Sequence, residues 1–322
     1  MNLALATTRT PLSLPRVGLG SAEGPDFEKM AKAVEAGCAS GVLLVDTAQN
    51  YGSEEAVGEG LRRFGKREAV FVLAKVDLCT REREAPKARM RRQVSRSLAR
   101  MGLDYLDAVA LHWPLLLDAP RDVDGLDARS VRLEAWRELE AMVDEGLVRH
   151  LGLSNFDVGL MDETLALSRI PPALNEIELS PRCYQAELLA ACVARNVVPV
   201  AYSPYGGCWL AKYFPDSVPW SADGLLDDET VAAVARDQGK GLTPAQVVLR
   251  WALQKGAAVI PKSLDPARVA ATAVCLDDDA SALDDALVAR LDALRDPRRG
   301  VQASLEAHAR IIAAPDYAWD PT

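Results

Sequence analysis

The sequence predicts an α/β protein built as a (β/α)8 TIM barrel with long loops at its C-terminal face. Short apolar runs rich in β-branched residues alternate with longer amphipathic stretches along the whole chain. Such alternation favours a parallel sheet, because parallel strands need crossover connections and helices supply them. Eight units of this kind in 322 residues match a closed barrel. The first turn, Gly18–Glu23, lacks the last glycine of G-x-G-x-x-G, which disfavours an open doubly wound sheet.

The individual elements follow from these runs. Strands are expected at Arg16–Gly20, Val42–Asp46, Val70–Lys75, Ala108–His112, Val148–Leu153, Ala173–Ile177, Val197–Tyr202 and Ala257–Ile260. Helices between them include Glu55–Phe64, Ala88–Met101, Ala135–Glu145, Met161–Ser168, Gln185–Arg195 and Pro244–Gln254. Within the third of these helices, Trp136, Leu139 and Val143 recur at spacings of three and four, as one buried helix face requires.

Three segments interrupt the alternation. Leu115–Ser130 follows the fourth strand, Tyr205–Gly224 follows the seventh, and a polar, proline-containing tail lies beyond Asp296. Loops after barrel strands lie on the face where ligands bind, so the two long loops either shape a pocket or are surface insertions. We expect residues 1–322 to form one barrel domain with a tail from about 297.

Composition narrows the class of protein. A formal charge of -9 and a pI of about 5.0 argue against a general nucleic-acid binder, and the basic stretch Arg81–Arg100 is expected to be a solvated helix face. Neither a signal peptide nor an apolar run long enough to span a membrane is evident. Six scattered cysteines and three histidines predict no metal site and no disulfide framework, which fits a cytoplasmic protein.

One motif resembles a phosphate-binding P-loop. The segment Gly60–Arg67 has the two glycines and the lysine, but Arg67 stands where Ser or Thr must ligate magnesium. It also ends a predicted helix instead of opening one. We therefore interpret Gly65 as the glycine that ends this helix.

Polar side chains gather at the ends of the predicted strands. Asp46, Lys75 and His112 end the second, third and fourth strands, and Tyr51 follows five residues after Asp46. In a barrel these ends converge on one mouth. A buried lysine or aspartate needs a partner, so the pattern predicts either a structural ion pair or a functional site. Further polar residues at strand ends are Ser154, Asn155, Glu176, Tyr202, Ser203 and Lys262.

These residues carry a resemblance to the aldo-keto reductase family, from about Val17 to Leu294. The matching segments, in the family's order, are Asp46–Gly52, Leu111–Pro114, Gly152–Phe156, Ala201–Pro204 and Ile260–Ser263. The resemblance implies reduction of an aldehyde or ketone to an alcohol with NADPH, acting on a small molecule, by a chain that works as a monomer.

The resemblance also assigns a catalytic tetrad of Asp46, Tyr51, Lys75 and His112. Hydride addition builds negative charge on the carbonyl oxygen, which needs a proton and a nearby donor. Tyr51 would give the proton, and the ammonium of Lys75 is expected to lower the phenol pKa. Asp46 would hold Lys75, while His112 would hydrogen-bond the carbonyl oxygen.

The cofactor residues are carried over in the same way. Tyr202, with Ser203 beside it, would stack on the nicotinamide, and Ser154 and Asn155 would bind its carboxamide. The expected clamp on the adenosine 2'-phosphate, which favours NADPH over NADH, consists of Lys262, Ser263 and Arg268.

The chain departs from the family's pattern at several positions. Glu176 replaces a usual Gln, and an ionised Glu accepts from the carboxamide but cannot donate to it. Ala271 and Thr272 replace residues that often bind the adenine. Ala22 stands where several members have a bulky aromatic residue, so we expect a roomier substrate pocket, lined also by Trp113. Trp209 and Trp220 either line this pocket or pack within their loop.

Two other functions compete with the reductase. A cofactor-binding sensor or regulatory protein on the same fold would bind NADPH with little turnover. A barrel hydrolase using Glu176 and Glu178 is a weaker alternative, because no metal ligands or nucleophile accompany these residues. The intact tetrad favours the reductase. Substrate identity and physiological direction stay open at this stage.

Overall fold

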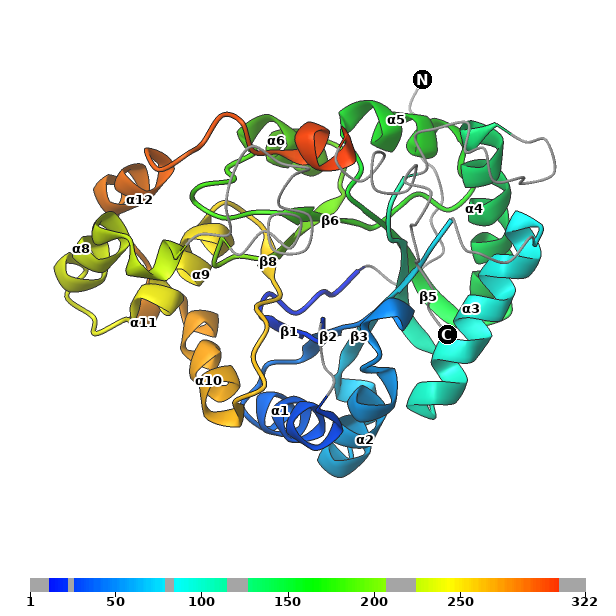
Figure 1. The fold of residues 1–322 in the computed structure, drawn as a ribbon, viewed down its shortest axis with the longest axis horizontal. Helices are drawn as coiled ribbons and strands as arrows, with labels where there is room; N and C mark the ends of the chain where they lie inside the picture. Colours follow the sequence, from blue (N-terminus) through cyan, green and yellow to red (C-terminus); the bar gives the residue numbers. More distant parts are fainter. Residues whose placement is uncertain (1–11, 23–25, 79–83, 115–126, 207–223, 307–322) are drawn as a thin grey trace, which may run out of the picture.

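The computed structural model describes residues 12–22, 26–78, 84–114, 127–206 and 224–306, in which eight parallel strands follow one another in sequence order around a barrel (Figure 1). Isolated bridges join Val17 to Val259 and Gly20 to Lys262, so the first and last strands meet. The predicted (β/α)8 fold is confirmed. The strands are β1 (Gly18–Gly20), β2 (Leu44–Asp46), β3 (Phe71–Val76), β4 (Leu106–Leu111), β5 (Val148–Ser154), β6 (Leu174–Glu178), β7 (Val198–Tyr202) and β8 (Ala258–Val259).

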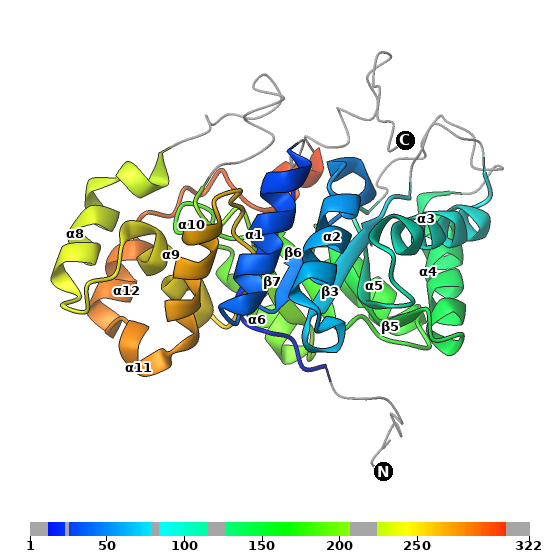
Figure 2. The ribbon, with the colours of Figure 1, turned by 90° about the horizontal axis from the view of Figure 1, so that it is seen from below.

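Helices form the outer layer, and α1, α2 and α10 stand next to one another along one side (Figure 2). The sequence sets many of their starts: Thr243, for example, begins α9 with a reciprocal capping box to Gln246. The α-helices are α1 (Phe27–Ala39), α2 (Glu54–Phe64), α3 (Pro86–Met101), α4 (Ala128–Asp144), α5 (Val158–Leu167), α6 (Ala186–Ala194), α8 (Glu229–Asp237), α9 (Pro244–Gln254), α10 (Pro266–Ala271), α11 (Asp278–Ser281) and α12 (Asp285–Asp292).

The interior of the barrel is apolar at one end. Successive strand residues point to opposite faces, so one set packs outward against the helices and the other packs inward. The inner set comprises Leu44, Phe71, Leu73, Ala108, Ala110, Leu174, Val200, Ala258 and Ile260. Leu12 and Leu14, which precede β1, pack against this set. The N-terminal end of the barrel is thus filled with apolar side chains, which leaves polar chemistry to the other end.

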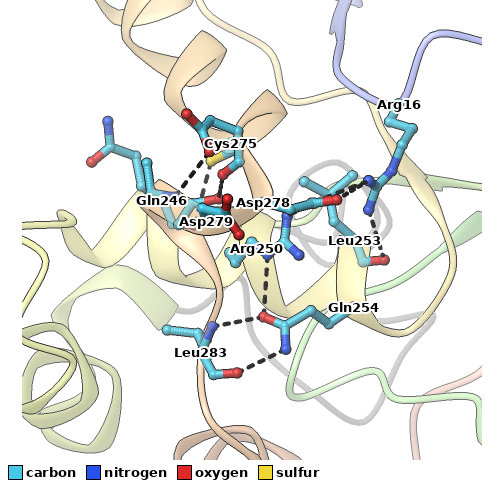
Figure 3. Close-up of polar contacts among 12 residues, drawn as sticks. Arg16, Gln246, Arg250, Leu253, Gln254, Cys275, Asp278, Asp279 and Leu283 are labelled. Carbon is cyan, nitrogen blue, oxygen red and sulfur yellow. Dashed lines mark hydrogen bonds and ion pairs between the residues drawn. The ribbon is translucent and has the colours of Figure 1, made fainter.

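A polar cluster ties the start of the barrel to the C-terminal helices (Figure 3). Asp278 of α11 contacts the guanidinium groups of both Arg16 and Arg250, and Arg16 also reaches the carbonyl of Leu253. Gln254 of α9 exchanges two hydrogen bonds of 2.9 Å with the backbone of Leu283. Arg250 itself is buried. The cluster fixes α9 and α11 relative to the segment that enters β1.

The strand predictions hold to within two residues at every boundary. The predicted loop Leu115–Ser130 is wrong at its end, because Asp127 caps a helix that begins at Ala128; residues 115–126 lie outside the described residues. Most of the other predicted loop, residues 207–223 with both of its tryptophans, lies outside as well.

The beginning of the predicted tail is attached to the barrel. The amide of Asp296 donates to the carbonyl of Arg182 at 2.9 Å, and the amide of Val301 donates to Gln185 Oε1 at 2.6 Å. Residues 307–322 lie outside the described residues.

The basic stretch was expected to be a solvated helix face, but on α3 this holds only in part. Arg89 is buried, and its guanidinium donates to the carbonyls of Leu78 and Glu84. Burial of the Arg89 charge is offset by these carbonyl dipoles. Arg91, by contrast, is partly exposed. It pairs with Glu138 on α4 and with Glu145, which follows the end of α4. In the part of the chain that the structure describes, no helix combines the length and apolarity needed to cross a membrane.

Candidate active site

Lys75 lies at the centre of the polar end of the barrel. It belongs to β3 and is buried, with its ammonium in contact with Asp46 Oδ2 at the end of β2. Glu176 Oε2, on β6, lies 3.2 Å from the same nitrogen. A lysine that is removed from water needs this negative charge beside it. The ion pair that the sequence predicted between Asp46 and Lys75 is therefore present, and a second carboxylate joins it.

Tyr51 lies beside this cluster. It is the last residue of a short 3-10 turn, Gln49–Tyr51, which follows β2. The next residue, Gly52, caps the turn with a left-handed backbone (φ 65°). The Lys75 ammonium lies 5.2 Å from the centre of the Tyr51 ring. On the other side, the Tyr51 hydroxyl lies 3.5 Å from Nε2 of His112, and the two rings meet edge to face. The four residues of the predicted tetrad, which lie at or after the ends of β2, β3 and β4, are thus brought together.

Burial controls the ionisation of these groups. Burial and the neighbouring Glu176 raise the pKa of Asp46 well above its ordinary value, against the opposing effect of Lys75. Although burial alone would lower the pKa of Lys75, the carboxylates of Asp46 and Glu176 outweigh it and raise this pKa above its ordinary value. Lys75 therefore keeps its charge at neutral pH.

Lys75 lowers the pKa of Tyr51, as expected, but the net shift of this pKa is upward. Burial raises the pKa of Tyr51 above its ordinary value of about 10, and the carboxylates of Asp46 and Glu176 add to the rise. Lys75 acts in the predicted direction but does not outweigh them. The phenol is consequently protonated near neutral pH, as a proton donor requires.

Two residues near His112 were missed by the sequence analysis. Asp77, which follows β3, is buried and places Oδ1 3.2 Å from Nδ1 of His112. The side chain of Gln93, on α3, donates to the Asp77 carbonyl at 2.8 Å and accepts from the Asp77 amide at 2.9 Å. The sequence held one signal for Asp77: it lies two residues after Lys75, and alternate strand positions share a face.

Three of the residues predicted to bind the nicotinamide, Ser154, Asn155 and Tyr202, form one hydrogen-bonded network. The side-chain amide of Asn155 donates to the carbonyl of His112 at 3.0 Å and to Ser154 Oγ at 3.1 Å. Its oxygen accepts from the Tyr202 hydroxyl at 2.7 Å. Asn155 and Ser203 both have left-handed backbones, with φ of 63° and 47°. Such non-glycine conformations are uncommon and cluster at functional sites.

Glu176 is paired with Lys75. Its expected contact with the nicotinamide carboxamide stays a prediction. Of the two predicted pocket residues, Trp113 is buried directly after His112, and Ala22 is half-buried after β1.

The predicted phosphate clamp follows β8. Lys262 and Arg268 are exposed, and Ser263 between them is half-buried. The carboxylate of Asp265 caps α10 by accepting from the amides of Ala267 and Arg268, and it lies 3.6 Å from the Arg268 guanidinium. Thr272 is buried and donates to the carbonyl of Val269, so its hydroxyl is used within the helix.

Comparison with known proteins identifies what this arrangement is similar to. The model of the Aldo/keto reductase family matches residues 16–296. Aldo-keto reductase family 1 member A1-A of Danio rerio is 35% identical over 283 residues, covering 83% of this chain and 82% of its own. Morphine 6-dehydrogenase of Pseudomonas putida is 35% identical over 287 residues, covering 88% of both chains. A Bombyx mori aldo-keto reductase solved with NADP aligns with a TM-score of 0.74 and 27% identity, covering 89% of this chain and 91% of its own.

Proposed function

The chain belongs to the aldo/keto reductase family, and on this premise we propose that it reduces an aldehyde or ketone to an alcohol with NADPH. The observation that carries the proposal is the position of Tyr51, whose hydroxyl faces His112 while its ring faces the ammonium of Lys75. A protonated phenol between an imidazole and an ammonium, at the mouth of a barrel, is suited to protonating a carbonyl oxygen.

The residues present fit NADP(H). Lys262 and Arg268 are exposed cations close in sequence to the Ser263 hydroxyl, a set that suits a phosphate group. Tyr202 presents a partly exposed ring whose hydroxyl is fixed by Asn155. Related aldo-keto reductases of Bombyx mori have been solved with NADP and with NADPH. When bound, NADPH supplies the hydride for carbonyl reduction.

The protein's own residues handle the proton. Tyr51 donates its phenolic proton to the substrate oxygen as negative charge develops there. Lys75 stays charged next to Asp46 and Glu176, and its ammonium stabilises the phenolate that Tyr51 leaves behind. His112 contacts the Tyr51 hydroxyl and so holds the proton donor in place. We further propose that the chain acts as a monomer in the cytoplasm on a small carbonyl compound.

The direct test follows the absorbance of NADPH at its long-wavelength band. Purified protein is mixed with NADPH and a panel of aromatic and aliphatic carbonyl compounds, with NADH in parallel. Oxidation of NADPH that depends on both protein and carbonyl compound supports the proposal. Binding of NADPH without oxidation across the panel would favour a cofactor sensor instead, and absence of binding would contradict the assignment of Lys262, Ser263 and Arg268.

A further inference from the structure

We propose that Asp77 is a positioning residue that fixes the tautomer of His112, so that Nδ1 carries the ring proton and Nε2 offers a lone pair to Tyr51. The consequence for catalysis rests on the proposed reductase function. The tautomer itself does not, because it depends only on groups of the protein.

The contact at Nδ1 carries the first step. Asp77 Oδ1 lies 3.2 Å from Nδ1, at an angle outside ordinary hydrogen-bond geometry, and both side chains are buried. An ionised carboxylate can only accept, so the ring nitrogen that faces it is favoured to carry a proton. A neutral imidazole has a single N–H, and its other nitrogen is then an acceptor. In His112 that other nitrogen is Nε2.

The surrounding structure holds both residues in this relation. The side chain of Gln93 accepts a hydrogen bond from the backbone amide of Asp77 at 2.9 Å and donates one to its backbone carbonyl at 2.8 Å. The side chain of Gln49 donates to the backbone of Gln93 and to Ser97, which fixes this part of α3. On the far side, Asn155 holds the carbonyl of His112 at 3.0 Å. A carboxylate that orients an imidazole in this way sets which nitrogen faces the reaction.

The second nitrogen faces the proton donor. Nε2 lies 3.5 Å from the Tyr51 hydroxyl, within reach of a hydrogen bond that Tyr51 donates until a carbonyl oxygen replaces Nε2 as the acceptor. Asp77 contacts Nδ1 of His112, while Lys75 lies 5.2 Å from the centre of the Tyr51 ring and pairs with Asp46 and Glu176.

Neutral His112 in this tautomer orients the Tyr51 hydroxyl and has no proton for a carbonyl oxygen. It becomes a donor there only after Nε2 takes up a second proton. The sequence-based expectation that His112 hydrogen-bonds the carbonyl oxygen would then apply only to the imidazolium.

The tautomer is measured directly by nitrogen-15 NMR of the cofactor-free, histidine-labelled protein at alkaline pH. The chain has only three histidines, so the variants His150→Gln and His308→Gln assign the signals of His112. We expect the wild type to show a protonated Nδ1 and an unprotonated Nε2. A protonated Nε2 in the wild type would overturn the proposal, whether or not any variant folds.

Asp77→Asn tests whether the charge of Asp77 sets the tautomer. Removing this charge should shift the population toward the Nε2–H tautomer. Asp104→Asn, which removes an exposed charge before β4, should leave the tautomer unchanged. Asp77→Asn should also lower kcat about tenfold, as loss of a residue that orients a catalytic imidazole does, with KM for NADPH unchanged. An unchanged tautomer in a folded Asp77→Asn variant would overturn the proposal.

If no carbonyl compound is reduced by any of these proteins, the reductase function fails and the tautomer result still decides the role of Asp77.

Discussion

Glu176 Oε2 lies 3.2 Å from Lys75 Nζ, which also contacts Asp46, so two buried carboxylates share one ammonium. With all three groups ionised, this cluster carries an excess negative charge. Burial and the charge of Glu176 accordingly raise the pKa of Asp46. The arrangement makes the stability of the site depend on pH.

Glu176→Gln should stabilise the protein at alkaline pH. Because the folded-state pKa of Asp46 is raised, the folded chain binds a proton more readily than the unfolded chain, and stability falls as pH rises through that pKa. Replacing Glu176 with Gln removes one of the charges that raise the pKa of Asp46. We expect a gain of about 1 kcal/mol at pH 8, roughly 2 °C in Tm, and a smaller gain at pH 5. Thermal unfolding followed by circular dichroism at both pH values measures it.

Glu178→Gln is the matched control, since it neutralises a second buried carboxylate on the same strand. If Glu176→Gln raises the stability equally at pH 5 and pH 8, repulsion between Glu176 and Asp46 is not the origin of the gain.

Lys75→Met should destabilise the fold strongly. It leaves Asp46 and Glu176 buried without their cation, and breaking a buried ion pair in this way costs about 3–5 kcal/mol. Urea unfolding at pH 7 measures the loss, and adding Asp46→Asn to the variant should recover part of it. Lys255→Met, which removes a less buried lysine paired with Asp292, should cost clearly less. Equal losses in the two single variants would contradict the account.

Arg268→Ala should weaken NADPH binding about tenfold and leave NADH binding nearly unchanged, because the arginine is assigned to the 2'-phosphate alone. The side chain is 82% exposed, so Tm should not move. Fluorescence titration with each cofactor measures both affinities, with Arg290→Ala, an exposed arginine on α12, as the control. A parallel loss of NADH and NADPH affinity would place the arginine elsewhere on the cofactor.

Arg250→Met should lower stability without affecting catalysis. Arg250 is buried and joins Asp278 to Gln254, so its loss costs about 1–3 kcal/mol. Arg16→Met removes the other partner of Asp278, but that side chain is 48% exposed and its loss should cost less. Thermal unfolding and kcat are measured on the same samples. A fall in kcat of Arg250→Met at temperatures where it is folded would show that the cluster reaches the active site.

Much of the fold was predictable because local signals agreed. Apolar runs located the strands to within two residues, and the capping pair Thr243 and Gln246 marks the start of a predicted helix. The start of α4 was missed because Ala128 lies at the end of a segment whose composition indicates a loop.

The candidate site was predictable where burial alone demanded a partner. Asp46 and Lys75 end neighbouring strands, and neither is stable alone in an apolar barrel. The pairing of Glu176 with Lys75 could not be predicted in this way, since it brings together side chains 101 positions apart (75 to 176) across the barrel interior. The role of Gln93 likewise depends on how α3 packs against the end of β3, which no local pattern specifies.

The most direct test of the central claim follows the hydride itself. Wild-type protein and Tyr51→Phe are incubated with NADPH deuterated at both C4 positions and with a carbonyl compound that the wild type turns over, and the alcohol is analysed by mass spectrometry. We expect one deuterium on the carbinol carbon with the wild type, and alcohol formation at least about 100-fold slower with Tyr51→Phe at unchanged NADPH affinity. Alcohol without deuterium, or full activity in Tyr51→Phe, would contradict the claim.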